Sequence, residues 1–268
     1  MRRFRSVGIT DIGLRRQNNE DNFLIDRDLG LFLVADGVGG HMAGDLASAM
    51  AVAAIRKYFL EHTEEFSATN DVTDSMGMSD VKIPCWSEPS SNRGRIAISA
   101  ALNYASNILF HESQRLLAPD GRSMGTTIAG IYFPYPNDGR AAIFNVGDSR
   151  LYIFRDQRLV QLTTDHSAYQ QWLSNGRSGP APSRNIITQA LGQAPKVMPS
   201  FRFEEIVTGD VILMCTDGLW GCLDQQTLTT HLENLDGDNL EGGGKKLIDA
   251  ALAASGADNI TVFLGQFT

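Results

Sequence analysis

The chain has 268 residues, of which 43% are hydrophobic and 20% are charged, a composition typical of a globular protein with a sizeable core. Its formal net charge of −8 argues against a nucleic-acid partner, because a negative surface repels a phosphate backbone. The same charge is compatible with a cluster of carboxylates gathered around cations.

The first half of the chain contains two predicted strands followed by two predicted helices. The strands cover 22–26 and 31–35, with a polar turn between them. Apolar residues three or four positions apart predict helices over 43–62 and 95–117. One face of the first helix carries Leu46, Met50, Ala53, Lys57 and Leu60, and the inner side of the second carries Ala97, Ala101, Tyr104 and Ile108.

Two segments lack any periodicity. Residues 67–94 are rich in Ser, Asn, Asp, Pro and Gly, and we interpret them as a polar surface insertion and not as a domain linker. Residues 163–199 contain several Gly and Pro residues and are predicted to be irregular.

The second half is rich in short strands and also contains two helices, predicted over 224–235 and 244–254. The predicted strands are 126–133, 141–146, 151–155, 158–162, 201–207, 211–215 and 260–266. Runs of strands that look antiparallel, interrupted by helix pairs, predict an α+β sandwich with helices on the outer faces of two sheets.

Acidic residues stand at the ends of several predicted strands. Apolar runs end in Asp36-Gly37 and Asp217-Gly218, and another ends close to Asp148. Conversely, Glu20-Asp21 and Asp258-Asn259 come directly before strands. In an antiparallel sheet the exit of one strand and the entry of its neighbour share an edge, so these acids are expected to converge on one rim.

Converging carboxylates repel one another, and buried ones must protonate unless cations neutralise them. Oxygen ligands select magnesium or manganese over zinc. Any single Asp here has a simpler explanation, because Asp-Gly is a common turn and Asp a common helix cap. The repeated pattern favours a metal site.

The glycine cluster from Gly37 to Gly44 resembles a nucleotide-binding loop without being one. It lacks the Gly-Lys-Ser/Thr of a P-loop, and Met42 replaces the third glycine of a dinucleotide fingerprint. We expect it to let the backbone turn tightly beside Asp36, so that a carbonyl faces a metal.

Taken together, these motifs resemble the metal-dependent protein phosphatases of the 2C type, in their bacterial serine/threonine form. The matching segments are Thr10–Asp21, Val34–His41, Met124–Thr127, Asn145–Arg150, Thr216–Gly218 and Asp258–Val262. Their order and spacing cover nearly the whole chain. The resemblance implies a single domain over 1–268, with two antiparallel sheets flanked by helix pairs and a flap at about 163–195 beside the active site.

The resemblance also implies a ligand set for two divalent cations, manganese or magnesium. Asp36 matches the bridging ligand, and the Gly37 carbonyl matches a ligand of one ion. Asp217 and Asp258 match ligands of the other ion. Further matches are Glu20 through metal-bound water, Asp148 for a possible third, weaker ion, Arg16 for the substrate phosphate, and Asn259, Asp21 and Thr126 as supporting residues.

The implied reaction is hydrolysis of phosphoserine or phosphothreonine in proteins. Two cations about 3.5–4 Å apart lower the pKa of a bridging water, and the resulting hydroxide attacks phosphorus in line with the departing oxygen. Arg16 offsets charge on the phosphate with its planar, permanently charged fork. No phosphoenzyme is needed, which agrees with the absence of a Cys-x5-Arg loop around Cys215 or Cys222.

The proton donor stays open. Many eukaryotic members have His directly after the Asp-Gly, whereas this chain has Val38. His41 or a metal-bound water are the alternatives for the general acid. His166 begins the predicted flap and is interpreted as flap structure.

Expectations for location and partners follow. The three cysteines lack zinc-site spacing and are expected to be free thiols in a reducing compartment. Neither a signal peptide nor a run near the roughly 18 apolar residues of a membrane span is found, so we expect a soluble cytoplasmic protein.

The expected substrates are proteins phosphorylated by a cognate Ser/Thr kinase. The protein itself is expected to be a monomer that binds neither nucleic acid nor membrane. Two alternative functions are considered. One is a two-metal phosphohydrolase that acts on nucleotides or nucleic acid, and the other is an inactive homologue that binds phosphoproteins or another partner.

Overall fold

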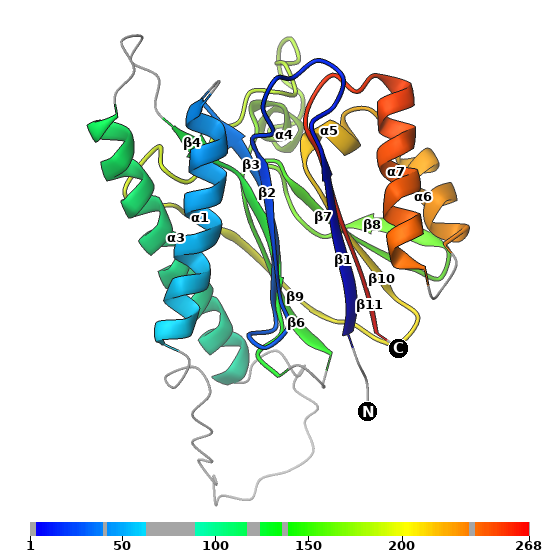
Figure 1. Ribbon diagram of the computed structural model, residues 1–268, viewed down its shortest axis with the longest axis horizontal. Helices are drawn as coiled ribbons and strands as arrows, with labels where there is room; N and C mark the ends of the chain where they lie inside the picture. The colour runs from blue at the N-terminus through cyan, green and yellow to red at the C-terminus, as the bar shows by residue number, and fades with distance from the viewer. Residues whose placement is uncertain are drawn as a thin grey trace, which may run out of the picture.

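The computed structural model describes residues 4–39, 42–62, 89–116, 124–135, 139–235 and 239–267. Two antiparallel sheets pack face to face, and helices cover both outer faces (Figure 1). This arrangement confirms the predicted α+β sandwich.

The first sheet joins the two ends of the chain. It has five strands in the order β1-β11-β10-β7-β8. Their bounds are β1 Phe4–Asp11, β11 Ile260–Phe267, β10 Val211–Cys215, β7 Arg150–Arg155 and β8 Arg158–Gln161. Because β1 pairs along its whole length with β11, the first and last strands close one sheet.

The second sheet is built from the middle of the chain. Its order is β2-β3-β5-β6-β9, and β4 pairs with the end of β3. The bounds are β2 Asp21–Asp26, β3 Leu31–Val38, β4 Gly125–Thr126, β5 Ile128–Tyr132, β6 Arg140–Val146 and β9 Ser200–Glu205. The strand β3 is almost wholly buried, as its continuous apolar run predicts.

Three layers of apolar side chains hold the sandwich together. Phe32, Phe263 and their neighbours fill the space between the sheets. The helices α1 (Met42–Glu61) and α3 (Pro89–Arg115) cover the second sheet, and α6 (Gln225–Glu233) and α7 (Leu240–Ala254) cover the first (Figure 1). Two short helices, α4 (Ala168–Ser174) and α5 (Asp217–Trp220), lie at one end of the sandwich.

Several predicted bounds are wrong. The strand β1 and the helices α4 and α5 were not predicted from the sequence. Helix α3 begins at Pro89, so 89–94 belong to a helix and not to the predicted insertion; 63–88 lie outside the described residues.

The buried side of α1 is also turned relative to the predicted face. Leu46 and Leu60 of that face are 38% and 50% exposed, whereas Ala47, Ala51 and Phe59 are buried. Small side chains make up much of this helix, so the apolar periodicity alone does not select the side that packs on the sheet.

The register of the strands brings the predicted site to one end of the sandwich. Asp21 is the direct partner of Asp36 in the β2–β3 pair. In the other sheet, Cys215 pairs with Val262, so the chain leaves β10 at Asp217 beside the entry of β11. Antiparallel pairing brings acids together at the edge of each sheet, and the face-to-face packing of the sheets places both edges at the same rim.

Candidate metal centre

A cleft of about 570 Å³ lies between the ends of the two sheets. Its walls contain the acids predicted for the site together with residues of the flap segment (residues 163–195). The lining residues are Arg16, Glu20, Asp36, Gly37, Val38, Gly39, Asp148, Asn185, Ile187, Gln193, Asp217, Asp258 and Asn259.

Asp36 is held by its backbone. The hydroxyl of Thr126 donates a 2.9 Å hydrogen bond to the Asp36 carbonyl oxygen, and Thr127 N–H donates another of 2.8 Å. The Asp36 N–H in turn donates to the Thr127 hydroxyl over 3.2 Å. These bonds fix the backbone of Asp36 near the end of β3, where the residue lines the cleft.

Gly37 and Gly44 allow three segments to approach one another closely. A Cβ on Gly37 would stand 2.1 Å from the Gly44 carbonyl oxygen, and a Cβ on Gly44 would stand 2.0 Å from a Glu20 carboxylate oxygen. Gly37 N–H donates to the Glu20 carbonyl oxygen over 3.0 Å. Gly37 and Gly44 thus permit close packing beside Asp36, whereas the expectation that the Gly37 carbonyl faces a metal stays a prediction.

Asp217 begins α5, directly after strand β10. Its neighbour Thr216 is fully buried and donates a 2.7 Å hydrogen bond to Asp21 Oδ2. Thr261 on β11 donates to the same oxygen over 2.7 Å. Asp21 therefore lies under the cleft as a carboxylate that ties β2 to β10 and β11, which fits a supporting role.

Asp258 and Asn259 connect the cleft to the loop after β1. The Asn259 side chain accepts from Glu20 N–H (2.8 Å) and donates to the carbonyl oxygens of Ile12 and Asn18 (2.9 Å each). Asp258 is 34% exposed and accepts a 2.6 Å charged hydrogen bond from Arg16. The loop that carries Arg16 is therefore fixed against the same rim as the acids.

Asp148 follows β6 through Gly147, whose φ of +99° favours glycine. Its side chain is 3% exposed, and burial with the nearby Asp217 raises its pKa to about 7. The positive charge of Arg150 lowers the pKa of Asp148, but by less than burial and Asp217 raise it.

The other acids of the rim have raised pKa values for the same reasons. Burial and the charge of Asp217 raise the pKa of Asp36 well above its ordinary value. Burial and Asp258 raise the pKa of Asp217 to about 6, although a hydrogen bond with Asp36 opposes this. For Asp21, burial raises the pKa to about 7 against the two threonine hydrogen bonds. The rim is a set of carboxylates that resist being ionised together.

These residues fit hard divalent cations, because several carboxylates and one backbone carbonyl supply only oxygen donors. Within the described ranges, no group of three or more His, Cys, Asp or Glu side chains yet stands in a geometry that could hold an ion. Asp258 is turned to Arg16 instead. Bound cations would replace the Arg16 contact of Asp258 and the protons on the buried carboxyls.

The raised pKa values predict how the cation-free protein responds to pH. In the folded state Asp21 and Asp148 have pKa values of about 7 instead of the ordinary 3.8, so between these values the folded state binds more protons than the unfolded chain. The free energy of unfolding should therefore fall as the pH rises from 4 to 7. Urea unfolding in EDTA measures this, and a free energy that stays constant or rises over this window would contradict the burial of ionisable acids here.

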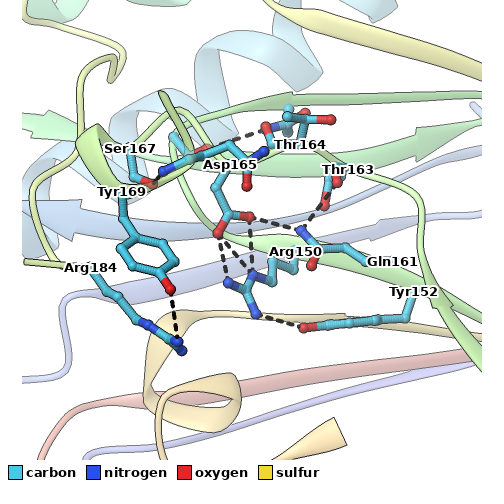
Figure 2. A network of polar contacts seen from close by, with 12 residues as sticks. Arg150, Tyr152, Gln161, Thr163, Thr164, Asp165, Ser167, Tyr169 and Arg184 are labelled. Atoms are coloured by element: carbon cyan, nitrogen blue, oxygen red, sulfur yellow. Dashed lines mark hydrogen bonds and ion pairs between the residues drawn. The ribbon is translucent and has the colours of Figure 1, made fainter. Parts of the chain in front are cut away.

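A second polar cluster is centred on Arg150, two residues after Asp148 of the cleft (Figure 2). Arg150 forms paired hydrogen bonds of 3.0 and 2.7 Å with Asp165 and a third of 3.0 Å with the Tyr152 hydroxyl. Its guanidinium carbon lies 3.6 Å from the ring centre of Trp220. Since Asp165 lies in the flap segment and Trp220 ends α5, this arginine joins the flap, strand β7 and the helix of Asp217.

His166 takes a structural place in the flap, in agreement with its interpretation from the sequence. Its Nδ1 accepts from Gly147 N–H (3.2 Å) and Gln189 Nε2 (2.8 Å), so the ring proton is assigned to Nε2, 2.8 Å from the Ser200 hydroxyl. Burial lowers its pKa.

Most predicted site residues lie together in the cleft, whereas His41 lies outside the described residues. Sequence reasoning does not select Asn185, Ile187 and Gln193, which reach the cleft because the flap segment folds back through isolated bridges. No local motif marks them. Thr127 was part of a matching motif, but only the structure gives it a contact with Asp36.

Comparison with known proteins identifies the family. A sequence model of the Protein phosphatase 2C family matches residues 14–236. The serine/threonine protein phosphatase PstP of Mycobacterium tuberculosis is 31% identical over 262 residues, or 96% of this chain and 44% of the relative. The serine/threonine phosphatase stp of Listeria monocytogenes is 31% identical over 263 residues, or 95% of this chain and 92% of the relative. The chain therefore belongs to the protein phosphatase 2C family.

A solved structure agrees with this family. The catalytic domain of the serine/threonine protein phosphatase PstP, in complex with two manganese ions, superposes with a TM-score of 0.75 at 28% identity and full coverage of both chains. The chain spans less than half the length of the first mycobacterial relative, which has a further part that this chain does not match.

Proposed function

We propose that this protein hydrolyses phosphoserine and phosphothreonine in proteins, using divalent cations held at the rim of the cleft. The observation that carries the proposal is the convergence of partly or fully buried acids from both sheets on one cleft, together with an arginine. The relatives named above are serine/threonine phosphatases, and one of them binds two manganese ions.

Asp36, the Gly37 carbonyl, Asp217 and Asp258 are the proposed ligands. Glu20 takes part through water, and Asp148 serves a third, weaker ion. When bound, the cations supply a water of lowered pKa as the attacking hydroxide. Thr126 fixes the direction of Asp36 through its 2.9 Å hydrogen bond to the backbone.

Arg16 is the proposed phosphate-binding residue. Its guanidinium already lies in the cleft, half exposed and 2.6 Å from Asp258, whose negative charge raises its pKa and keeps it charged. A phosphate group offers the same pair of oxygen acceptors as a carboxylate, so Arg16 would exchange Asp258 for the substrate. The proton donor is either His41 or a water in the cleft.

The physiological setting is the less direct part of the proposal. Phosphoproteins produced by a Ser/Thr kinase are the proposed substrates, and we propose that the protein acts in the cytoplasm as a monomer. In the part of the chain that the structure describes, no helix combines the length and the apolar character needed to cross a membrane.

Removal of metal tests the proposed reaction. Purified protein should release phosphate from a phosphothreonine peptide in manganese, lose this activity in EDTA and recover it when manganese is restored, because the hydroxide depends on the cations. A phosphotyrosine version of the same peptide is the comparison for substrate class. Full activity in EDTA would sink the assignment of the cleft as a metal centre.

A further inference from the structure

The charges around the cleft are distributed unevenly. The chain contains 31 Asp and Glu residues, yet His166–Phe203 contains none, while it carries Arg177, Arg184, Lys196 and Arg202. The loop Ile12–Asn19, which brings Arg16 to the cleft, likewise carries Arg15 and Arg16 without an acid. Ile12–Asn19 and His166–Phe203 each contribute residues to the cleft wall and carry basic residues without an acid, although the protein as a whole is negative.

Of these cations, Arg184 in the flap segment stands beside the cleft. Asn185 and Ile187 line the cleft, and Arg184 directly precedes them. Arg184 is exposed and lies over the ring of Tyr169, with its guanidinium carbon 4.7 Å from the ring centre and a 3.3 Å hydrogen bond to the hydroxyl (Figure 2). The Tyr169 ring also packs against Trp172, with ring centres 5.5 Å apart, so the platform under Arg184 is itself supported.

An aromatic partner leaves the charge of Arg184 available. By contrast, Arg150 forms an ion pair with Asp165 and Arg155 forms one with Asp210, so a carboxylate neutralises the charge of each arginine. Within the described part of the chain, neither Arg184 nor the exposed Arg177 has a carboxylate partner. A cation–π contact orients a guanidinium without neutralising it, and its planar fork remains free to bind a carboxylate through two hydrogen bonds.

We propose that the cationic border of the cleft, formed by Arg15 and Arg184, binds acidic side chains that flank the phosphorylated residue of a protein substrate. The substrate class is a phosphoserine or phosphothreonine segment rich in Asp and Glu, with Arg184 as the main specificity-determining residue. This inference rests on the proposed phosphatase function. A protein with a net charge of −8 repels acidic segments at a distance, so a local cationic border is what permits their approach.

Three phosphothreonine peptides that differ only in their flanks test the inference, with three Asp, three Asn or three Lys residues beside the same phosphothreonine. In manganese, kcat/KM should be on the order of two- to fivefold higher for the Asp peptide than for the Asn peptide, as expected of exposed ion pairs. It should be lowest for the Lys peptide. The difference should shrink in 0.5 M salt, because exposed charges are screened.

Variants assign the preference to the flap. In Arg184→Glu the ratio of Asp to Asn peptide should fall to one or below, and Arg184→Lys should retain part of the preference. Arg158→Glu makes the same charge change at an exposed arginine on β8, outside the cleft, and should keep the wild-type ratio. The ratio is measured within each variant, so a general loss of activity does not imitate a loss of preference.

The outcomes separate this inference from the function on which it rests. If the wild-type protein hydrolyses all three peptides with equal kcat/KM, the acidic substrate class is wrong and the phosphatase function stands. If Arg158→Glu changes the ratio as much as Arg184→Glu does, the flap is not the site of selection. If no peptide and no p-nitrophenyl phosphate is hydrolysed in manganese, the proposed function itself is overturned.

Discussion

Replacement of Asp36 by Asn is expected to lower kcat for a phosphothreonine peptide by roughly a thousandfold or more, because loss of one preorganised electrostatic group already costs about 10²–10³. Asp36 is the only proposed ligand that bridges both ions, so its loss disturbs both. Its backbone contacts to Thr126 and Thr127 do not involve the side chain and should persist. Steady-state phosphate release in manganese measures the effect.

A matched control lies at the other end of the same hairpin. Asp26 on β2 is buried and accepts hydrogen bonds from Arg56 and Leu29, but it lies away from the cleft. Asp26→Asn should leave kcat within about twofold of the wild type, as expected of a site with no contact to the reacting groups. Equal losses in the two variants would show that the Asp36 effect is structural. In EDTA, Asp36→Asn should be at least as stable as the wild type, since the pKa of Asp36 is raised by burial.

Replacement of Arg150 by Met is expected to lower the free energy of unfolding by about 3–5 kcal/mol, because it leaves a buried carboxylate without its partner. Asp165 is 9% exposed and would keep only its 2.8 Å contact from Gln161. The contact with the Trp220 ring is lost as well. Urea unfolding measures the change, and phosphate release should fall with it because the flap and α5 lose their shared contact.

Two further variants distinguish the effect of leaving a buried carboxylate unpaired from the effect of the position of Arg150 near the cleft. Arg150→Met combined with Asp165→Leu should recover much of the lost stability, because an apolar pair in place of a buried ion pair is often neutral. Arg155, at the far end of β7, pairs with the buried Asp210. Arg155→Met should also destabilise the protein but keep kcat near the wild-type value. If it lowers kcat as Arg150→Met does, the link between the Arg150 cluster and the cleft is wrong.

The strands that precede the proposed ligands could be predicted because the pattern that indicates each strand lies within the strand itself. Strands β3 and β10 are buried on both faces, so they read as continuous apolar runs, and the first Asp after each run marks the exit. The antiparallel rule then places Asp36 beside Asp21 in one sheet and Asp217 near Asp258 in the other, and the packing of the two sheets brings both edges to one rim. The predicted sandwich and the convergence of the acids both follow from these two runs.

The strand β1 could not be predicted because it depends on pairing with a strand that is far away in the sequence. Its residues are half-buried without clear alternation, and it becomes a strand through pairing with β11 at the other end of the chain. Phe4 then packs against Phe32, Phe133 and Phe267, with ring centres 4.9–5.0 Å away. Tertiary contact, and not propensity, determines this element.

Helix α4 has a capping signal in its sequence. Ser167 caps it by accepting from Gln170 N–H over 3.2 Å, and Ser-x-x-Gln is a known pattern at helix starts. With only seven residues, none buried, the helix has no apolar period to recognise. The positions of Asn185, Ile187 and Gln193 depend on how this segment folds back, and no sequence pattern contains that information.

The position of bound manganese tests the central claim most directly. Anomalous diffraction from crystals soaked in manganese should reveal two peaks in the cleft, about 3.5–4 Å apart, with Asp36 between them. One ion should contact the Gly37 carbonyl oxygen, and the other should contact Asp217 and Asp258, with Arg16 released from Asp258. Manganese peaks outside the cleft only, in crystals of protein that is active in solution, would contradict the assignment of these carboxylates as the metal centre.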